Sequence, residues 1–259
     1  MKLIHFGCSF AVGNGVPHYV KGLPSDIAPR VHRFGGSERR ETQKDFEFKI
    51  KAPYTCGNYI ADKLKLGFQK IAMNGGSNEM IFRRLIETNL KNSFVLIGLT
   101  TDNRREGLTD RRNRSHWHTW KIVGPGQDVG YKDVMFSPWK DEYLPAIIEE
   151  CQIRTLTQII YMQNYLKNNN VPYLIFNALH NGFDTPHTSE AQELLNKVDE
   201  QNFFQLRAAH EETQHGWCLT NGLCVSENDE HPAIDGHCAW GLKMLNMTKS
   251  ILEAHDADR

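Results

Sequence analysis

The chain opens with Lys2-Leu3-Ile4-His5-Phe6-Gly7-Cys8-Ser9-Phe10-Ala11-Val12-Gly13, and its expected architecture follows from this stretch. The run from Leu3 to Phe6 is short and mostly apolar and stops at Gly7, which predicts a buried strand. Ligands of open α/β sheets bind outside the carboxyl ends of the strands. We therefore expect Ser9 at that edge, where a serine acts as a nucleophile if a base reaches it and donors receive the oxyanion.

Apolar runs and helical patterns alternate along the rest of the chain. Further strands are predicted at 68–73, 94–99 and 171–176, and helices over 53–66, 80–90 and 140–168. This alternation indicates an α/β sheet with parallel strands and right-handed crossovers. Beyond it we expect a helix that starts with a Ser189–Gln192 capping box, a short fifth strand within 219–225 and a last helix from about Pro232.

Length and composition favour one domain without a strong partner preference. The 259 residues include a polar excursion at 14–51 and an insertion at 101–140. The net charge of −1 is too small to attract nucleic acid or a membrane surface electrostatically. No apolar run approaches the roughly 20 residues of a membrane span. The first apolar run is too short for a signal peptide, so we expect a cytoplasmic protein whose six cysteines are free thiols.

Two later segments supply partners for Ser9. Asp229-Glu230-His231-Pro232 precedes the last predicted helix, and Asn74-Gly75-Gly76-Ser77-Asn78 follows the second predicted strand. Because the carboxyl ends of parallel strands meet at one edge of the sheet, both segments can reach Ser9. His231 is the candidate base, and Asp229 or Glu230 would orient its ring.

The glycine-rich segment is the candidate oxyanion site. Gly75 and Gly76 would bring backbone N–H groups close to a substrate oxygen, and Asn78 adds a side-chain donor. Taken alone, each segment has a plainer interpretation: Ser9 as a turn residue, His231 as a helix start and the glycines as a turn. Their joint placement at one edge favours the catalytic interpretation.

These residues resemble the SGNH, or GDSL-type, hydrolase superfamily, and in particular its short phage and environmental members. Gly7-Cys8-Ser9-Phe10 is similar to the first family block, with Cys8 where Asp usually stands. Asn74–Asn78 is similar to the second block. The last block is matched by His231-Pro232, Gly236-His237 and Trp240. The resemblance covers the chain from end to end, in order.

The resemblance implies a three-layer α/β/α sandwich with a parallel, flavodoxin-like sheet of about five strands. It also implies ester hydrolysis through an acyl-enzyme, with Ser9 as nucleophile, His231 as base and Asp229 to orient it, and without a cofactor or metal. Two positions depart from the family pattern. Thr100 takes the place of an oxyanion-donating Asn, and Asn228 stands three before His231 where the family has Asp.

The insertion at 101–140 interleaves Arg, His and Trp. Arg104, Trp117 and Trp120 are candidate substrate-binding residues, and family analogy suggests an acyl or acetyl group on a carbohydrate as the substrate. The same composition also fits an RNA-binding strip or a polar loop pinned to the core by its tryptophans. The near-neutral charge argues against nucleic acid, so the expected partner is a small-molecule or glycan ester.

Two other functions stay open. The departures at Thr100 and Asn228 are also consistent with a glycan-binding or virion-associated protein that keeps the fold without efficient catalysis. A structural zinc site is the other, because ligand types gather in the C-terminal third: His215, Cys218, Cys224, His231, His237 and Cys238. The Cys-x5-Cys spacing differs from the usual zinc knuckle, and a zinc ion on His231 would exclude the hydrolase.

Overall fold

The sheet at the centre of the molecule is parallel throughout. The computed structural model describes residues 1–13, 54–73, 75–111, 114–121, 144–226 and 229–257, without the side chains of 105–148. The strand order is β2-β1-β3-β6-β7, the flavodoxin-like order that the family resemblance implies. The strands are β1 (Lys2–Gly7), β2 (Gly67–Ala72), β3 (Ser93–Leu99), β6 (Tyr173–Asn177) and β7 (Phe203–Phe204).

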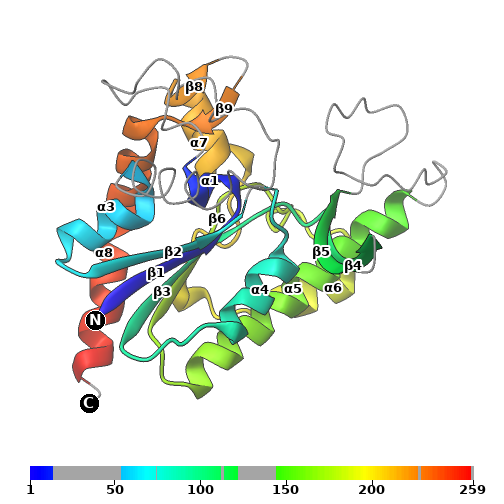
Figure 1. Ribbon diagram of the computed structural model, residues 1–259. Helices are drawn as coiled ribbons and strands as arrows, with labels where there is room; N and C mark the ends of the chain where they lie inside the picture. The colour runs from blue at the N-terminus through cyan, green and yellow to red at the C-terminus, as the bar shows by residue number, and fades with distance from the viewer. Residues whose placement is uncertain (14–53, 74, 112–113, 122–143, 227–228, 258–259) are drawn as a thin grey trace.

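Helices cover both faces of this sheet (Figure 1). One face carries α3 (Cys56–Lys63) and α8 (Ile234–Ala257), which pack against each other. The other face carries α4 (Asn78–Glu87), α5 (Leu144–Asn168) and α6 (Ser189–Leu195). The predicted three-layer α/β/α sandwich is therefore confirmed.

Side chains of β1 alternate between two apolar cores. Leu3 joins the core that includes Ile60 of α3 and Trp240 of α8, whereas Ile4 joins the core of α4 and α5. Both faces of the strand are covered, so the sequence lacks the apolar–polar alternation of a half-exposed strand. His5 is the polar exception: it is 1% exposed and its ring lies 6.1 Å from that of Phe176.

The predicted short strand within 219–225 is confirmed only at Cys224 and Val225, and it does not belong to the main sheet. The chain there ends helix α7 (Gln214–Thr220), turns at Gly222 with φ of 65°, and enters β8 (Cys224–Ser226). β8 pairs antiparallel with β9 (Asp229–Pro232) in a sheet of its own. The fifth strand of the main sheet is β7, and its two residues are too short to produce a recognisable pattern in the sequence.

Two predicted helix starts also differ. Thr188, not Ser189, caps α6, because Thr188 Oγ1 accepts a hydrogen bond from the Ala191 amide at 3.1 Å. The last helix begins at Ile234, since Pro232 closes β9.

The two predicted interruptions fare differently. The excursion at 14–51 lies outside the described residues. The insertion at 101–140 holds an antiparallel hairpin of β4 (Arg104–Arg111) and β5 (Arg114–Lys121), which its residue pattern does not predict. No helix in the described part of the chain has the length and apolar character needed to cross a membrane.

Candidate active site

Ser9 lies at the carboxyl end of β1, as expected. It is the first residue of a single helical turn, α1 (Ser9–Val12), which ends at Gly13 with φ of 79°. The turn is tight: a Cβ added to Gly7 would lie 2.6 Å from that of Ala11, so only glycine fits there. Ser9 is 8% exposed, and its amide, as the first of a helix, has no acceptor within the helix.

His231 and Asp229 form a hydrogen-bonded pair on β9. His231 Nδ1 lies 2.7 Å from Asp229 Oδ1, and the His231 backbone amide donates to the same oxygen at 3.2 Å. Both side chains are about 30% exposed. A carboxylate on Nδ1 leaves Nε2 to accept a proton, which is the arrangement of a general base.

The pair lies against the helix that carries the serine. The His231 ring packs on the ring of Phe10, the residue after Ser9, with centroids 5.3 Å apart. Helix α1 also contacts β9. The structure thus brings together the nucleophile and base segments, which are more than 200 residues apart in the sequence.

The glycine-rich segment reaches the same edge of the sheet. The Met73 amide donates to the carbonyl of Gly7 at 3.2 Å, which holds the start of this segment beside the end of β1. Gly75 has φ of 69°, and the Gly76 amide donates to the Met73 carbonyl at 3.1 Å. Asn74 lies outside the described residues.

Asn78 and Thr100 are bound to each other. Asn78 Nδ2 donates to the Thr100 carbonyl at 3.1 Å, and the Thr100 amide donates to Asn78 Oδ1 at 2.9 Å. The pair joins the start of α4 to the end of β3. The side-chain amide of Asn78 is therefore bound to the backbone of Thr100 and has a structural role. Thr100 Oγ1 is buried and has no hydrogen-bond partner within the described part of the chain. The oxyanion roles of these residues stay predictions.

Of the candidate substrate-binding residues, Arg104 contacts the glycine-rich segment. Its Nη1 donates to the carbonyl of Gly76 at 3.4 Å. Trp117 and Trp120 lie on β5, opposite Leu108 and Arg105 of β4, and their side chains are outside the described set.

The candidate zinc ligands do not converge. No group of three or more His, Cys, Asp or Glu among the described residues is placed to hold a metal ion. His237 and Cys218 are fully buried, whereas His231 is bound to Asp229. All six cysteines are free thiols.

Burial perturbs three ionisable groups near the site. Desolvation lowers the pKa of His5 to about 3, and it lowers the pKa of His237 to about 3 with help from the nearby His231. Desolvation raises the pKa of Asp102, just beyond β3, to about 6 against the attraction of Arg154. His5 and His237 are therefore neutral at physiological pH.

The sequence did not predict a second histidine–carboxylate pair on β9. His215 Nε2 lies 2.9 Å from Glu230 Oε2, and the His215 ring meets the Phe10 ring edge-on at 5.8 Å. The two pairs thus flank Phe10. Consecutive side chains of a strand point to opposite faces, so Glu230 points away from the face of His231. Glu230 binds His215 there, and Asp229 is the carboxylate that binds His231.

Comparison with known proteins finds similarity to solved structures. No family model matches the chain, and no curated protein matches it. A carbohydrate esterase family 2 enzyme of Myceliophthora fergusii is 13% identical with a TM-score of 0.44, covering 97% of this chain and 66% of its own. An acetyl xylan esterase from Butyrivibrio proteoclasticus is 11% identical with a TM-score of 0.45, covering 98% of this chain and 64% of its own.

A third similar structure comes from the family that the motifs resemble. It is described as a lipolytic protein of the G-D-S-L family from Desulfitobacterium hafniense, is 11% identical with a TM-score of 0.39, and covers 95% of this chain and 98% of its own. The present chain spans just under two thirds of the length of the carbohydrate esterases it matches. Similarity at this level carries no information about activity.

Proposed function

We propose that the protein is a serine hydrolase that cleaves an ester through an acyl-enzyme. The observation that carries this proposal is the His231–Asp229 pair, whose imidazole packs on Phe10, the residue directly after Ser9. A base, a carboxylate to orient it and a serine at a strand end are the parts that such chemistry needs.

In the proposed reaction, Ser9 Oγ attacks the ester carbonyl while its proton passes to His231 Nε2. The tetrahedral intermediate collapses, and the alcohol leaves with the proton from Nε2. Water then attacks the acyl-serine and gives a proton to Nε2. Nε2 returns this proton to Ser9 Oγ as the acid leaves, so both the serine and the neutral imidazole are restored. Asp229 stays ionised throughout and stabilises the imidazolium.

The oxyanion would be held by backbone amides. The Ser9 amide lies at the start of α1, and Gly75 lies in the turn against the end of β1. The Gly76 amide is already bound to the Met73 carbonyl, so Gly76 would shape the turn. The hydroxyl of Thr100 is a further candidate donor because it has no partner among the described residues. Asn78 would contribute by fixing Thr100 in place through its two hydrogen bonds.

We further propose that the alcohol part of the ester is a carbohydrate, bound with the help of the hairpin that carries Arg104, Trp117 and Trp120. Arg104 supports this because its guanidinium already reaches the glycine-rich turn. Tryptophan rings provide apolar faces that suit a sugar ring, and a nearby guanidinium donates to its oxygens.

A fluorophosphonate probe tests the nucleophile directly, because it forms a covalent bond with an activated serine. Wild type should label and hydrolyse p-nitrophenyl acetate, and Ser9→Ala should do neither. Ser250→Ala is the matched control, since Ser250 is an exposed serine on α8. If neither wild type nor the control labels, the hydrolase proposal fails and the binding-protein alternative takes its place.

A further inference from the structure

A row of aromatic rings runs along the carboxyl edge of the sheet, away from the catalytic pair. From Phe10 it continues to His215 at 5.8 Å, from His215 to His210 at 5.4 Å, and from His210 to His180 at 6.0 Å between ring centroids. The contacts at His215 and His210 are edge-on, with interplanar angles of 75–90°. The rings come from three separate segments beyond α1, so no local pattern in the sequence indicates the row.

The outer rings of the row are held on a fixed backbone. The His215 amide donates to the Ala178 carbonyl at 3.0 Å, which joins α7 to the loop after β6. Thr213 Oγ1 donates to the His210 carbonyl at 2.7 Å. The rings are therefore positioned by the scaffold before any ligand arrives.

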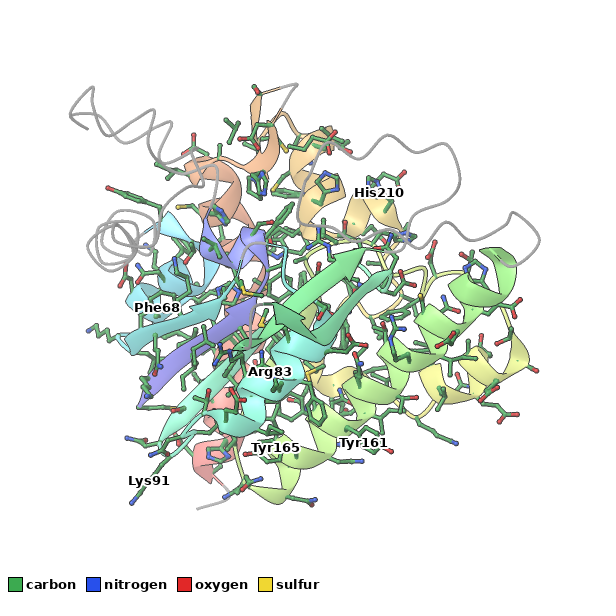
Figure 2. The ribbon with its side chains drawn as sticks, turned by 45° about the vertical axis from the view of Figure 1, so that its right-hand side comes forward. Phe68, Arg83, Lys91, Tyr161, Tyr165 and His210 are labelled. Carbon is green, nitrogen blue, oxygen red and sulfur yellow. The ribbon has the colours of Figure 1, made fainter. Side chains whose placement is uncertain are left out.

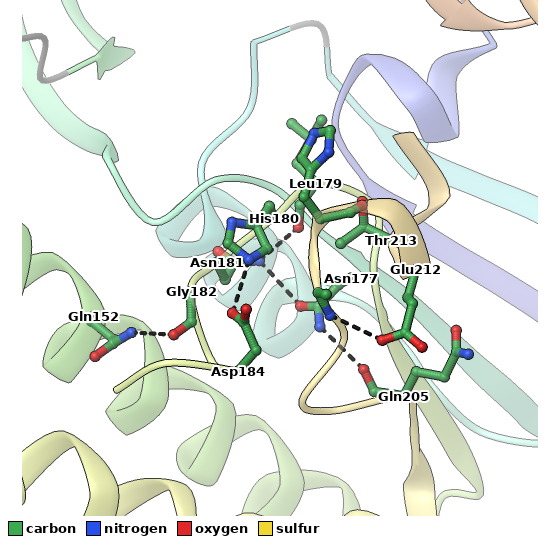
Figure 3. Close-up of polar contacts among 12 residues, drawn as sticks. Gln152, Asn177, Leu179, His180, Asn181, Gly182, Asp184, Gln205, Glu212 and Thr213 are labelled. Carbon is green, nitrogen blue, oxygen red and sulfur yellow. Dashed lines mark hydrogen bonds and ion pairs between the residues drawn. The ribbon is translucent and has the colours of Figure 1, made fainter. Parts of the chain in front are cut away.

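The loop after β6 is also anchored (Figure 3). Asn177, at the end of β6, donates to the carbonyls of Gln205 and Leu206, and Asn181 Nδ2 donates to Asn177 Oδ1 at 3.1 Å. His180 Nε2 lies 2.9 Å from Asp184 Oδ1 in the same loop. This network fixes the outer end of the row.

The three histidines differ in exposure in a way that suits contact with a ligand. His210, labelled in Figure 2, is exposed although rings pack on both sides of it. The side chains of His180 and His215 are 33% and 17% exposed. An exposed ring between two half-buried rings presents an apolar surface bordered by nitrogen atoms.

The charges around the row select the class of ligand. The carboxylates of Asp184 and Glu230 bind the outer nitrogens of His180 and His215, and Asp229 lies at the catalytic end. Each carboxylate keeps acceptor capacity for hydroxyl donors, and an imidazole with one nitrogen on a carboxylate offers the other nitrogen as an acceptor. The same carboxylates repel an anion. A neutral polyhydroxylated ring fits both requirements, with its C–H face on the rings and its hydroxyls at their edges.

We propose that His180, His210 and His215 form the subsite for the alcohol part of the ester, and that this subsite binds neutral sugar rings in preference to uronic acids. The subsite deepens the proposed hydrolase function, on which its catalytic consequence rests. Its place follows from continuity, because the row begins at Phe10, next to Ser9 and His231.

Binding and turnover are measured separately. Calorimetry on the Ser9→Ala protein with xylotetraose, cellotetraose and mannotetraose, and with tetragalacturonate as the anionic comparison, tests the subsite without catalysis. At least one neutral tetrasaccharide should bind at least tenfold more tightly than tetragalacturonate. His210→Ala in the same background should weaken that binding about tenfold, the loss expected for one or two hydrogen bonds and a packing face. His180→Ala is a second variant, at the outer end of the row, and should weaken the same binding.

Turnover provides the second readout. With the O-acetylated form of the best-bound sugar and with p-nitrophenyl acetate, His210→Ala should lower the ratio of the two kcat/KM values about tenfold, mainly through KM. His187→Ala is the matched control, because His187 is an exposed histidine near the same loop but outside the row, and it should leave both binding and the ratio unchanged.

The outcomes separate the two proposals. Loss of fluorophosphonate labelling with intact sugar binding would refute the hydrolase and keep the subsite. Binding of tetragalacturonate as tight as that of the neutral sugars, no binding of any sugar, or equal behaviour of His210→Ala and His187→Ala would refute the subsite. A fall in both kcat/KM values without a change in their ratio would show a merely structural role for His210.

Discussion

The histidines at the carboxyl edge of the sheet, here called the rim, differ from the histidines buried below it in exposure and in their hydrogen-bond partners. At the rim, His231, His215 and His180 each have a carboxylate within 2.9 Å and are partly exposed. Beneath it, His5 and His237 are fully buried beside apolar side chains. Neither ring nitrogen of His5, and only Nδ1 of His237, has a hydrogen-bond partner in the part of the chain that the structure describes.

The difference shows what a carboxylate does to an imidazole. A general base must be oriented by a partner and reachable by the substrate, and a ring that is bound to a carboxylate and partly exposed meets both requirements. A buried ring without a carboxylate stays neutral, and its pKa falls to about 3. The first set is therefore suited to chemistry and binding, and the second makes stability depend on pH.

The largest effect should come from His231. His231→Ala removes the proposed base and should lower kcat for p-nitrophenyl acetate about 10⁴-fold or more, as loss of a triad histidine does in serine hydrolases. His215→Ala removes the ring on the other side of Phe10 and should lower the same kcat less than about tenfold, because His215 is not the proposed base. Steady-state kinetics on both variants, with thermal unfolding as a check on folding, measures the contrast. A larger loss from His215→Ala would reassign the base to the other pair.

A smaller effect is expected at the carboxylates. Asp229→Asn should lower kcat about 10³-fold, because the amide stabilises neither the tautomer nor the imidazolium. Glu230→Gln, the adjacent residue on the same strand, should lower it less than about threefold, since its partner is His215. If the two variants lose activity equally, Asp229 does not orient the base, in spite of its 2.7 Å contact with His231.

Much of the fold could be predicted because its signals are local. β1 is an apolar run that stops at a glycine, and the alternation of strands and helices correctly predicted parallel strands. The order of the strands was implied by the family resemblance. β7 could not be predicted, since Phe203 and Phe204 carry no periodicity. The strand expected at 219–225 is present only from Cys224 onward, because the end of α7 and the turn at Gly222 occupy the earlier residues.

The site was predictable in its sequence motifs but not in its long-range pairings. Asp229 and His231 are two residues apart and do meet in the structure. The bond between Asn78 and the backbone of Thr100 spans 22 residues, and the ring row joins segments from Phe10 to His215. Neither contact leaves a pattern at any fixed spacing. His5 occupies a position that the strand pattern marks as buried, but the pattern says nothing about its lack of a partner.

The smallest effect concerns stability, and its sign follows from three pKa shifts. His5 and His237 have folded pKa values of about 3, below the 6.5 of a free histidine, so the unfolded chain binds two more protons between about pH 4 and pH 6. The pKa of Asp102 is about 6 in the folded chain and 3.8 in the free residue, so Asp102 makes the folded chain bind one more proton between pH 4 and pH 6. The net excess of one proton in the unfolded state means that stability falls as pH falls.

Urea unfolding between pH 4 and pH 6 should therefore show the unfolding free energy falling by about 1.4 kcal/mol per pH unit. Asp102→Asn removes the opposing proton and should steepen the slope to about 2.7 kcal/mol per pH unit, whereas His5→Leu should bring it close to zero. Ser250→Ala, which changes an exposed serine of α8 that does not titrate, should leave the slope as in wild type. A His5→Leu slope equal to that of wild type would mean that His5 gains a proton in the folded protein, and the contrast between rim and buried histidines would then be lost.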